Sequence, residues 1–215
     1  MDTNVFRTWI TTAAGVIDAN RDHLTQLDAA IGDADHGINL ARGFAAVLAA
    51  LDTKPAPTPG AVLIVTGSTL ISKVGGASGP LYGTAFRRAG QALGTVEEVG
   101  LPALGQALEA ALAGVQQLGA AREGDKTMVD ALAPATRALA KAVAEGAAQD
   151  DALAAAAAAA AEGAAATVSM EARKGRASYL GPRSVGHEDP GAASTALILA
   201  ALRDAAARDS GAGAP

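Results

Sequence analysis

Three aspartates, Asp28, Asp33 and Asp35, lie within eight residues of the sequence, with glycines close by. Carboxylates held together in a low-dielectric pocket raise one another's pKa values unless a positive charge lies among them. Oxygen ligands favour a hard divalent cation, and Mg²⁺ usually takes a few carboxylates together with water and phosphate oxygens. The spacing suggests a metal site with a phosphorylated ligand. It suits equally a turn whose aspartates cap the next helix or face water.

A second polar segment, residues 74–80, is a glycine-rich turn directly before a predicted helix. Such a turn can present backbone N–H groups and the Ser78 hydroxyl to a phosphate, because the first N–H groups of a helix have no partner within it. The segment lacks the Gly-Lys-Ser/Thr sequence of a Walker A motif. Taken alone, it is more typical of a tight connection between helices.

Two later segments add further charged side chains. Residues 123–130 again place Gly-Asp before a helix, so Asp125 is predicted to cap that helix, and Met128 is a core residue or a side chain against a nucleobase. Residues 174–191 show no regular period, and so long a segment in a compact domain is typical of a lid or a binding loop. The basic side chains in and beside it supply the positive charge that a polyphosphate site with Mg²⁺ requires, and they are Arg173, Lys174, Arg176 and Arg183.

Composition narrows the class of protein. The 215 residues are expected to form one domain over residues 1–208 with a flexible tail at 209–215, and a core of small aliphatic side chains, since only 3% are aromatic. The absence of cysteine excludes disulfides and thiolate zinc sites. We find neither a signal peptide nor a long uncharged apolar stretch, and expect a soluble, cytoplasmic protein with no membrane partner. A net charge of −5 argues against nonspecific nucleic-acid binding.

Apolar residues recur at helical spacing almost throughout, which predicts an all-α protein of about eight helices. Residues 60–73 are ambiguous, because their apolar run could form a buried strand, but such a strand would have no sheet to join. Three prolines in residues 54–60 mark a connection between helices, and the eight consecutive alanines at 154–161 favour a helix. The first helix contains Phe6 to Ile17, and the others are expected over 38–52, 60–73, 80–93, 102–118, 127–145, 149–172 and 191–208.

Taken together, the four polar segments resemble the nucleotide-binding L subunit of bacterial dihydroxyacetone kinase. The resemblance runs from about residue 3 to residue 208, in the family's order and with nothing large inserted. Four motifs matched in order are far more specific than any one of them. The matching motifs are residues 28–37, 75–80, 124–128, and 175–181 together with 189–191.

The resemblance implies a single-domain antiparallel barrel of eight helices, whose loops at one end hold ADP or ATP through two Mg²⁺ ions. Asp28, Asp33 and Asp35 match the family's metal ligands. The resemblance assigns no catalytic nucleophile to this chain. The other matched positions contact or line the nucleotide, and they are His36, Gly37, Ile38, Asn39, Ala77, Ser78, Gly119, Met128, Arg176, Asp189, Pro190 and Gly191.

The same resemblance implies transfer of a phosphoryl group from the Mg-bound nucleotide to dihydroxyacetone on a separate K subunit, because this chain lacks the substrate-binding part that is fused in ATP-dependent relatives. In phosphoenolpyruvate-dependent systems, a phosphotransferase-system M subunit rephosphorylates the bound ADP. Two alternatives stay open. One is a subunit of an ATP-dependent kinase for a related ketose such as erythrulose, and the other is a nucleotide-sensing regulatory module. The oligomeric state also stays open, with a homodimer as one arrangement.

Overall fold

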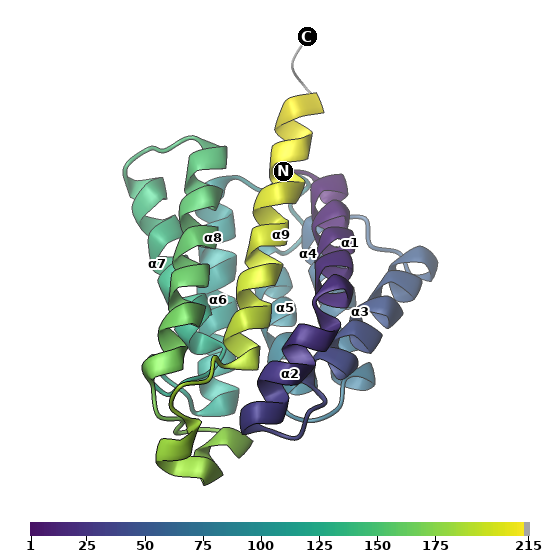
Figure 1. The fold of residues 1–215 in the computed structure, drawn as a ribbon. Helices are drawn as coiled ribbons and strands as arrows, with labels where there is room; N and C mark the ends of the chain where they lie inside the picture. Colours follow the sequence, from purple (N-terminus) through teal and green to yellow (C-terminus); the bar gives the residue numbers. More distant parts are fainter. Residues whose placement is uncertain (213–215) are drawn as a thin grey trace.

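The computed structural model describes residues 1–212, and the side chains of residues 1–209. The described chain is all-helical, as the sequence predicts (Figure 1). Two 3-10 helices, η1 (Thr167–Ser169) and η2 (Arg176–Ser184), lie between the last two α-helices. The nine α-helices of this part of the chain are α1 (Thr3–Ala19), α2 (Arg21–Ile31), α3 (His36–Thr53), α4 (Pro59–Lys73), α5 (Ser78–Leu93), α6 (Leu101–Gly119), α7 (Val129–Ala144), α8 (Gln149–Ala166) and α9 (Pro190–Ala212).

Eight of these helices form a closed antiparallel ring. Each helix from α3 to α9 packs on the next, α9 packs on α1, and α1 contacts α3. The chain reverses at each step, as in helical bundles, through short connections except between α8 and α9, where residues 167–189 contain η1 and η2. The remaining helix, α2, follows α1 and packs against α3 at one end of the ring (Figure 1). The ring agrees with the predicted antiparallel barrel of about eight helices.

Helix α2 is the element that the apolar pattern failed to predict. Only Leu24, Asp28 and Ile31 of its residues are buried, and the helix is polar overall, so it offers few apolar residues from which to predict it. As a result, Asp28 lies in the last turn of a helix, whereas Asp33 and Asp35 lie in the loop that follows.

Other helix boundaries differ less from the prediction. The ambiguous segment 60–73 is helical, and α4 begins at Pro59 after Thr58, whose hydroxyl accepts a hydrogen bond from the Ala61 N–H at 3.2 Å. Helix α8 ends at Ala166, before the predicted residue 172, because the chain turns through η1 into an extended conformation at Met170. Helix α9 continues past residue 208 to Ala212, and residues 213–215 of the predicted tail lie outside the described residues.

The core combines a few aromatic rings with close helix contacts. Trp9 joins the first and last helices of the ring, because its indole Nε1 donates to the Ile198 carbonyl at 2.9 Å while its ring packs on Phe86. Helices α4 and α5 approach backbone to backbone, since a Cβ added at Gly67 would lie 2.4 Å from the Gly83 carbonyl oxygen. Small residues therefore let the helices pack closely, so the core is filled although it contains few aromatic side chains.

One stretch, Gln149–Ser169, is long and apolar enough to cross a membrane by length and composition alone, with a mean hydropathy of 1.3. Its eight consecutive alanines produce this value. In the fold, α8 packs on α7 and α9 as one wall of the ring. Core helices of soluble proteins pass the same test, so this finding is weak evidence for a membrane span.

The antiparallel ring brings alternate connections to the same end of the molecule. The connections α2–α3, α4–α5, α6–α7 and α8–α9 lie at the bottom of Figure 1, and Met1 lies near the opposite end. These four connections contain the four polar segments identified in the sequence. The fold thus gathers segments that are far apart along the chain into one site.

Candidate functional site

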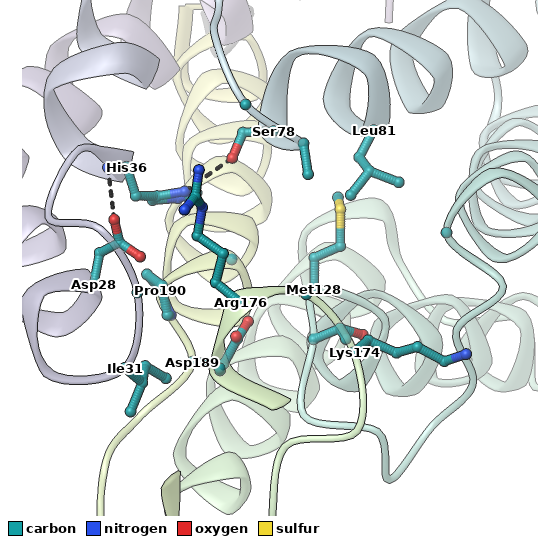
Figure 2. A pocket seen from close by; sticks show the side chains of 18 of the residues that line it. Asp28, Ile31, His36, Ser78, Leu81, Met128, Lys174, Arg176, Asp189 and Pro190 are labelled. Carbon is teal, nitrogen blue, oxygen red and sulfur yellow. Dashed lines mark hydrogen bonds between the residues drawn. The ribbon is translucent and has the colours of Figure 1, made fainter. Parts of the chain in front are cut away.

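A cavity of about 290 Å³ opens among these four connections (Figure 2). Its wall also includes Leu81 and Lys126, which the sequence analysis did not single out. Most of the predicted site residues line it, and these are Asp28, Asp33, Asp35, His36, Ala77, Ser78, Gly119, Met128, Arg176, Asp189, Pro190 and Gly191.

Three predicted residues in the first turn of α3 do not line the cavity. Gly37 faces α2, where an added Cβ would lie 2.0 Å from the Arg21 carbonyl oxygen. Asn39 is buried, and its Oδ1 accepts a hydrogen bond from Arg42 at 2.8 Å. Ile38 is 51% exposed to solvent. Gly37 therefore allows α3 to pack closely against α2, and the Asn39 side chain is held within α3.

Asp28 organises the loop that follows it. Its Oδ2 accepts hydrogen bonds from the backbone N–H groups of Asp35 at 2.8 Å and His36 at 3.1 Å, and thereby caps the start of α3 from outside (Figure 2). Gly32 leaves room for this carboxylate, because an added Cβ would lie 2.0 Å from Asp28 Oδ1. The chain turns sharply after Gly32, with Ala34 in the left-handed region at a φ of 62°.

One carboxylate oxygen from each of Asp28, Asp33 and Asp35 lies within 4.8 Å of the others. Asp35 occupies the N-cap position of α3, yet its side chain makes no capping hydrogen bond. Asp33 pairs with Arg176, at 3.1 Å from its Nε. The helix-capping alternative therefore fails for Asp35, and the three carboxylates form an oxygen donor set that suits a hard divalent cation.

His36 connects residues 28–35, called the aspartate loop below, to two other helices. Its Nδ1 lies 3.0 Å from the Ser78 hydroxyl on α5, and its Nε2 lies 2.8 Å from the Ser194 hydroxyl on α9. Burial lowers the pKa of His36, although Asp28 and Asp35 oppose this shift. The imidazole is therefore a neutral bridge that orients Ser78 at the glycine-rich turn.

The opposite end of the cavity is apolar. Leu81 of α5 and Met128, which directly precedes α7, lie close to each other in the cavity wall (Figure 2). Gly119 at the end of α6 also belongs to the cavity lining. A ligand with a flat apolar group at one end and anionic groups at the other fits this division.

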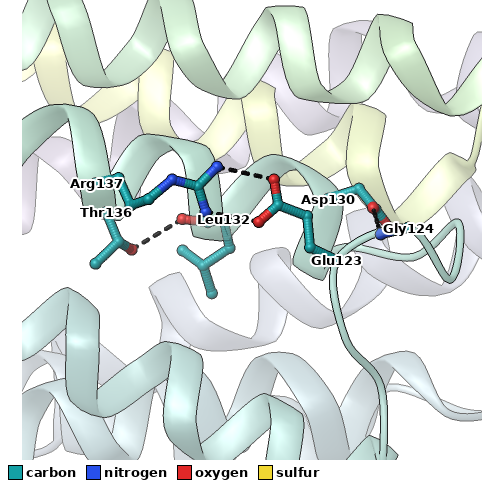
Figure 3. A network of polar contacts seen from close by, with 6 residues as sticks. All are labelled: Glu123, Gly124, Asp130, Leu132, Thr136 and Arg137. Carbon is teal, nitrogen blue, oxygen red and sulfur yellow. Dashed lines mark hydrogen bonds and ion pairs between the residues drawn. The ribbon is translucent and has the colours of Figure 1, made fainter.

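The α6–α7 loop, residues 120–128, is fixed by side chains of α7 (Figure 3). The Asp130 carboxylate accepts from the backbone N–H groups of Gly124 at 2.5 Å and Thr127 at 2.7 Å. Asp125 does not cap α7 as predicted, because its own carboxylate accepts from the Arg122 N–H at 3.0 Å. The signal for the correct residue was the spacing Thr127-x-x-Asp130, which is typical of a capping box.

Residues 171–186, called the lid segment below, form a short irregular layer over the cavity. Most of this segment is η2, which is interrupted at Gly181, where φ is 55°. Its Ala172 and Ala177 pack with Ile31 of α2 in a small apolar cluster separate from the main core. This placement is compatible with both predicted roles of residues 174–191, a lid or a binding loop, and it brings Arg176 to Asp33 (Figure 2).

Asp189 lies at the start of α9, where its Oδ2 accepts from the Ala192 N–H at 2.8 Å. Burial raises the pKa of Asp189 to about 7, and the negative charge of Asp130 adds to the shift. The Ala192 N–H and the Lys126 ammonium act in the opposite direction. Asp189 therefore changes its charge near neutral pH.

The family pattern of the DAK2 domain matches residues 30–204. The chain is 43% identical to the ADP-binding subunit DhaL of the PEP-dependent dihydroxyacetone kinase of Escherichia coli (strain K12), over 92% of this chain and 94% of that protein. It is 41% identical to the corresponding subunit of dihydroxyacetone kinase 1 of Listeria innocua, over 90% of this chain and 92% of that protein.

The fold is also similar to solved structures of the dihydroxyacetone kinase of C. freundii. The native form matches with a TM-score of 0.71 and 29% identity, over 95% of this chain and 34% of that chain. The form in complex with AMP-PNP and Mg²⁺ matches with a TM-score of 0.66, over 91% of this chain and 33% of that chain. This chain thus spans about a third of that longer kinase. From these matches, the chain belongs to the DAK2 domain family, and it matches ADP-binding DhaL subunits of that family along nearly its whole length.

Proposed function

We propose that this chain is the nucleotide-binding subunit of a multi-subunit dihydroxyacetone kinase, in which it holds Mg-bound ADP or ATP. The phosphoryl group passes from this nucleotide to dihydroxyacetone on a separate K subunit. Relatives that match along nearly their whole length are ADP-binding subunits of PEP-dependent kinases for this sugar. A solved relative binds AMP-PNP and Mg²⁺.

One observation carries the proposal: the cavity is acidic at one end and apolar at the other. In the described part of the chain, main-chain N–H groups bond to the Asp28 carboxylate but to neither Asp33 nor Asp35. Neither carboxylate is needed to hold the main chain, so both can ligate a cation, with Asp33 also paired to the Arg176 side chain. Such a cation would bring the phosphate chain of a nucleotide to this end of the cavity.

We assign Asp28, Asp33 and Asp35 as ligands of two Mg²⁺ ions. Because Asp28 Oδ2 already accepts two N–H groups, Asp28 Oδ1 is the oxygen left to face a cation. When bound, Mg²⁺ neutralises charge that develops on the transferred phosphoryl group. The side chains present fit this requirement in type and spacing.

The remaining residues contact the base at one end of the cavity and the phosphates at the other. Leu81, Gly119 and Met128 form the place for the base, with residues 189–191 beside it. His36, Ser78 and Arg176 lie toward the phosphates (Figure 2), and Ala77 directly precedes Ser78 in the cavity wall. For Gly37 and Asn39 we propose a supporting role behind the loop, and the exposed Ile38 has the weakest geometric support among the assigned positions.

This chain then acts by binding and orientation, with no nucleophile of its own. Arg176 on the lid segment donates to phosphate oxygens. His36 bonds to the Ser78 hydroxyl and thereby fixes its orientation within the glycine-rich turn. Fixed donors of this kind align the phosphoryl group and need no rearrangement during transfer. The acceptor hydroxyl is supplied by the K subunit.

We further propose that the ADP stays bound and is rephosphorylated by a phosphotransferase-system M subunit in the cytoplasm. A relative from Lactococcus lactis that is 37% identical over 93% of this chain is the ADP-binding subunit of a PTS-dependent kinase. The four connections that form the cavity lie at one end of the ring, where a second protein can reach the phosphate end. Both partners would use this face in turn.

A second candidate is a kinase subunit for a related ketose. The chain is 37% identical to L-erythrulose 1-kinase of Mycolicibacterium smegmatis, over 85% of this chain and 32% of that protein. Because the sugar is held by the K subunit in the proposed arrangement, this cavity would be the same for either acceptor. The choice of sugar therefore has to be tested with the partner present.

Mass spectrometry and absorbance of the freshly purified, denatured protein test the proposal first. About one ADP per chain is expected, with loss of the nucleotide after removal of Mg²⁺ by a chelator. Transfer is then followed from phosphoenolpyruvate to dihydroxyacetone with K and M subunits added. A protein that neither retains nor binds ADP or ATP in the presence of Mg²⁺ would contradict the proposed function.

A further inference from the structure

Lys126 is the least expected side chain in the cavity wall. Only 1% of it is exposed, and its backbone lies in the left-handed region at a φ of 62°. Burying an ammonium group is costly unless hydrogen bonds replace its water. A left-handed conformation adds a further cost for a residue other than glycine. Such a residue persists only where the surrounding structure strongly favours it.

The ammonium group is held by three main-chain carbonyl groups. Lys126 Nζ donates to the carbonyl oxygen of Thr167 at 2.8 Å, to that of Met170 at 3.2 Å, and to that of His187. An ammonium has three protons, so all of its donors are in use. The Lys126 ammonium therefore has no N–H left to donate to a ligand in the cavity.

The three carbonyl groups lie at the two ends of the lid segment. Thr167 and Met170 precede residues 171–186, and His187 follows them. Two other hydrogen bonds close the base of the segment on itself, from the Gly186 N–H to the Val168 carbonyl at 2.7 Å and from the Asp189 N–H to the Thr167 hydroxyl at 2.9 Å. One ammonium thus holds both ends of the lid segment.

Lys126 itself belongs to the α6–α7 loop, which also carries Met128. Asp130 fixes the backbone of this loop on both sides of Lys126, and Arg137 adds a two-pronged ion pair to Glu123 (Figure 3). The N–H of Arg173 also bonds to the Asp125 carbonyl at 3.0 Å. The lid segment is therefore attached to the α6–α7 loop, which the side chains of α7 hold in place.

We propose that Lys126 is a positioning residue that sets where the lid segment lies over the nucleotide, and thereby where Arg176 meets the phosphates. The inference rests on the proposed function for the identity of the ligand. The attachment of the lid segment to the α6–α7 loop follows from the hydrogen bonds alone.

The test replaces Lys126 by methionine, which keeps the unbranched stem and removes all three donors. Without nucleotide, we expect faster hydrogen exchange in residues 171–186 than in the unaltered protein. With Mg-ADP bound, we expect the dissociation rate of ADP to rise by about tenfold. Lys141→Met is the matched control, because Lys141 is an exposed residue of α7 whose side chain pairs with Glu145. It should change neither measurement.

A double substitution separates positioning from a general loss of stability. If Lys126 acts through Arg176, Lys126→Met should change the ADP dissociation rate by less than about twofold when Arg176 is already alanine. The inference would be overturned if Lys126→Met raised the ADP dissociation rate by the same factor with Arg176 and with alanine at this position. It would also be overturned if hydrogen exchange in residues 171–186 were unchanged. Should Lys126→Met fail to fold, Lys126→Gln retains two N–H donors on a shorter stem, and the same comparison is made with it.

The failure of the proposed function gives a different result. A wild-type chain that binds neither ADP nor ATP with Mg²⁺ removes the nucleotide from both statements. Hydrogen exchange in the absence of ligand then still decides whether Lys126 holds the lid segment. If hydrogen exchange in residues 171–186 is then faster in Lys126→Met than in the wild-type and Lys141→Met proteins, Lys126 still holds the lid segment, and the cavity beneath it binds another ligand.

Discussion

The aspartate loop and the α6–α7 loop contain the same residue types and use them differently. Asp125 and Asp130 direct their carboxylates to backbone N–H groups, and so both are occupied in holding the loop. In the aspartate loop Asp28 alone does this work, whereas Asp33 and Asp35 line the cavity without holding the main chain, and Asp33 pairs with the Arg176 side chain. A Gly-Asp pair therefore indicates a ligand site only when other groups already accept the hydrogen bonds of the nearby backbone N–H groups.

The largest expected effect comes from Asp33→Ala. Since Asp33 holds no part of the backbone, we expect Mg-ADP affinity to fall by about 100-fold or more, with helicity and unfolding free energy nearly unchanged. Titration calorimetry measures the affinity, circular dichroism the helicity, and urea denaturation the free energy of unfolding. Asp52→Ala, at the exposed far end of α3, is the control. Retention of ADP by Asp33→Ala through gel filtration would refute the metal assignment.

Asp130→Ala should show the reverse behaviour. It removes the acceptor for two backbone N–H groups at a helix start, so the free energy of unfolding should decrease by about 2 kcal/mol. Urea denaturation measures the change, with Asp33→Ala as the reference. If both variants lost stability equally, the distinction between the two loops would not hold.

Asp189 predicts how stability depends on pH. With a pKa of about 7 in the folded protein and about 4 in the unfolded chain, the folded state binds more protons between these values. The unfolding free energy should therefore decrease as pH rises from 5 to 7, by about 1 to 2 kcal/mol from this group. Asp189→Asn, which retains an acceptor for the Ala192 N–H, should flatten that slope in urea titrations at several pH values. An unchanged slope would show that Asp189 is ionised throughout.

The smallest effect is expected for Glu123→Gln. The Glu123 and Arg137 side chains are 44% and 62% exposed, and an exposed ion pair contributes about 0.5 kcal/mol. Thermal unfolding at low and high salt measures this contribution, which should vanish at high salt. A loss as large as that of Asp130→Ala would mean that the ion pair, rather than the buried carboxylate, holds the loop.

Sequence patterns predicted helices where apolar side chains are abundant and missed the helix where they are few. Residues 60–73 form the expected helix because apolar residues cover most of α4, whereas α2 escaped prediction because its sequence is polar. The end of α8 also escaped prediction, since Ala166 and the residues after it are equally compatible with a helix. There the boundary depends on tertiary contacts, including the bond from Lys126 to the Thr167 carbonyl.

Much of the candidate site was predictable because its four segments each combine glycine with polar residues. What could not be predicted is which carboxylate each backbone N–H group selects. Asp125 and Asp130 are both well placed in sequence to cap α7, and only the three-dimensional path of the loop decides between them. Lys126 gave no signal at all, because a lysine in a polar segment is normally exposed.

The closed ring has a consequence for how the protein folds. The final contact of the ring joins α1 to α9, so Trp9 meets Ile198 only after almost the whole chain has been synthesised. Contacts so distant in sequence slow folding. Until α9 docks, the nascent chain exposes the apolar face of α1 and lacks the Asp189–Gly191 wall of the cavity, so nucleotide can stabilise only the completed ring.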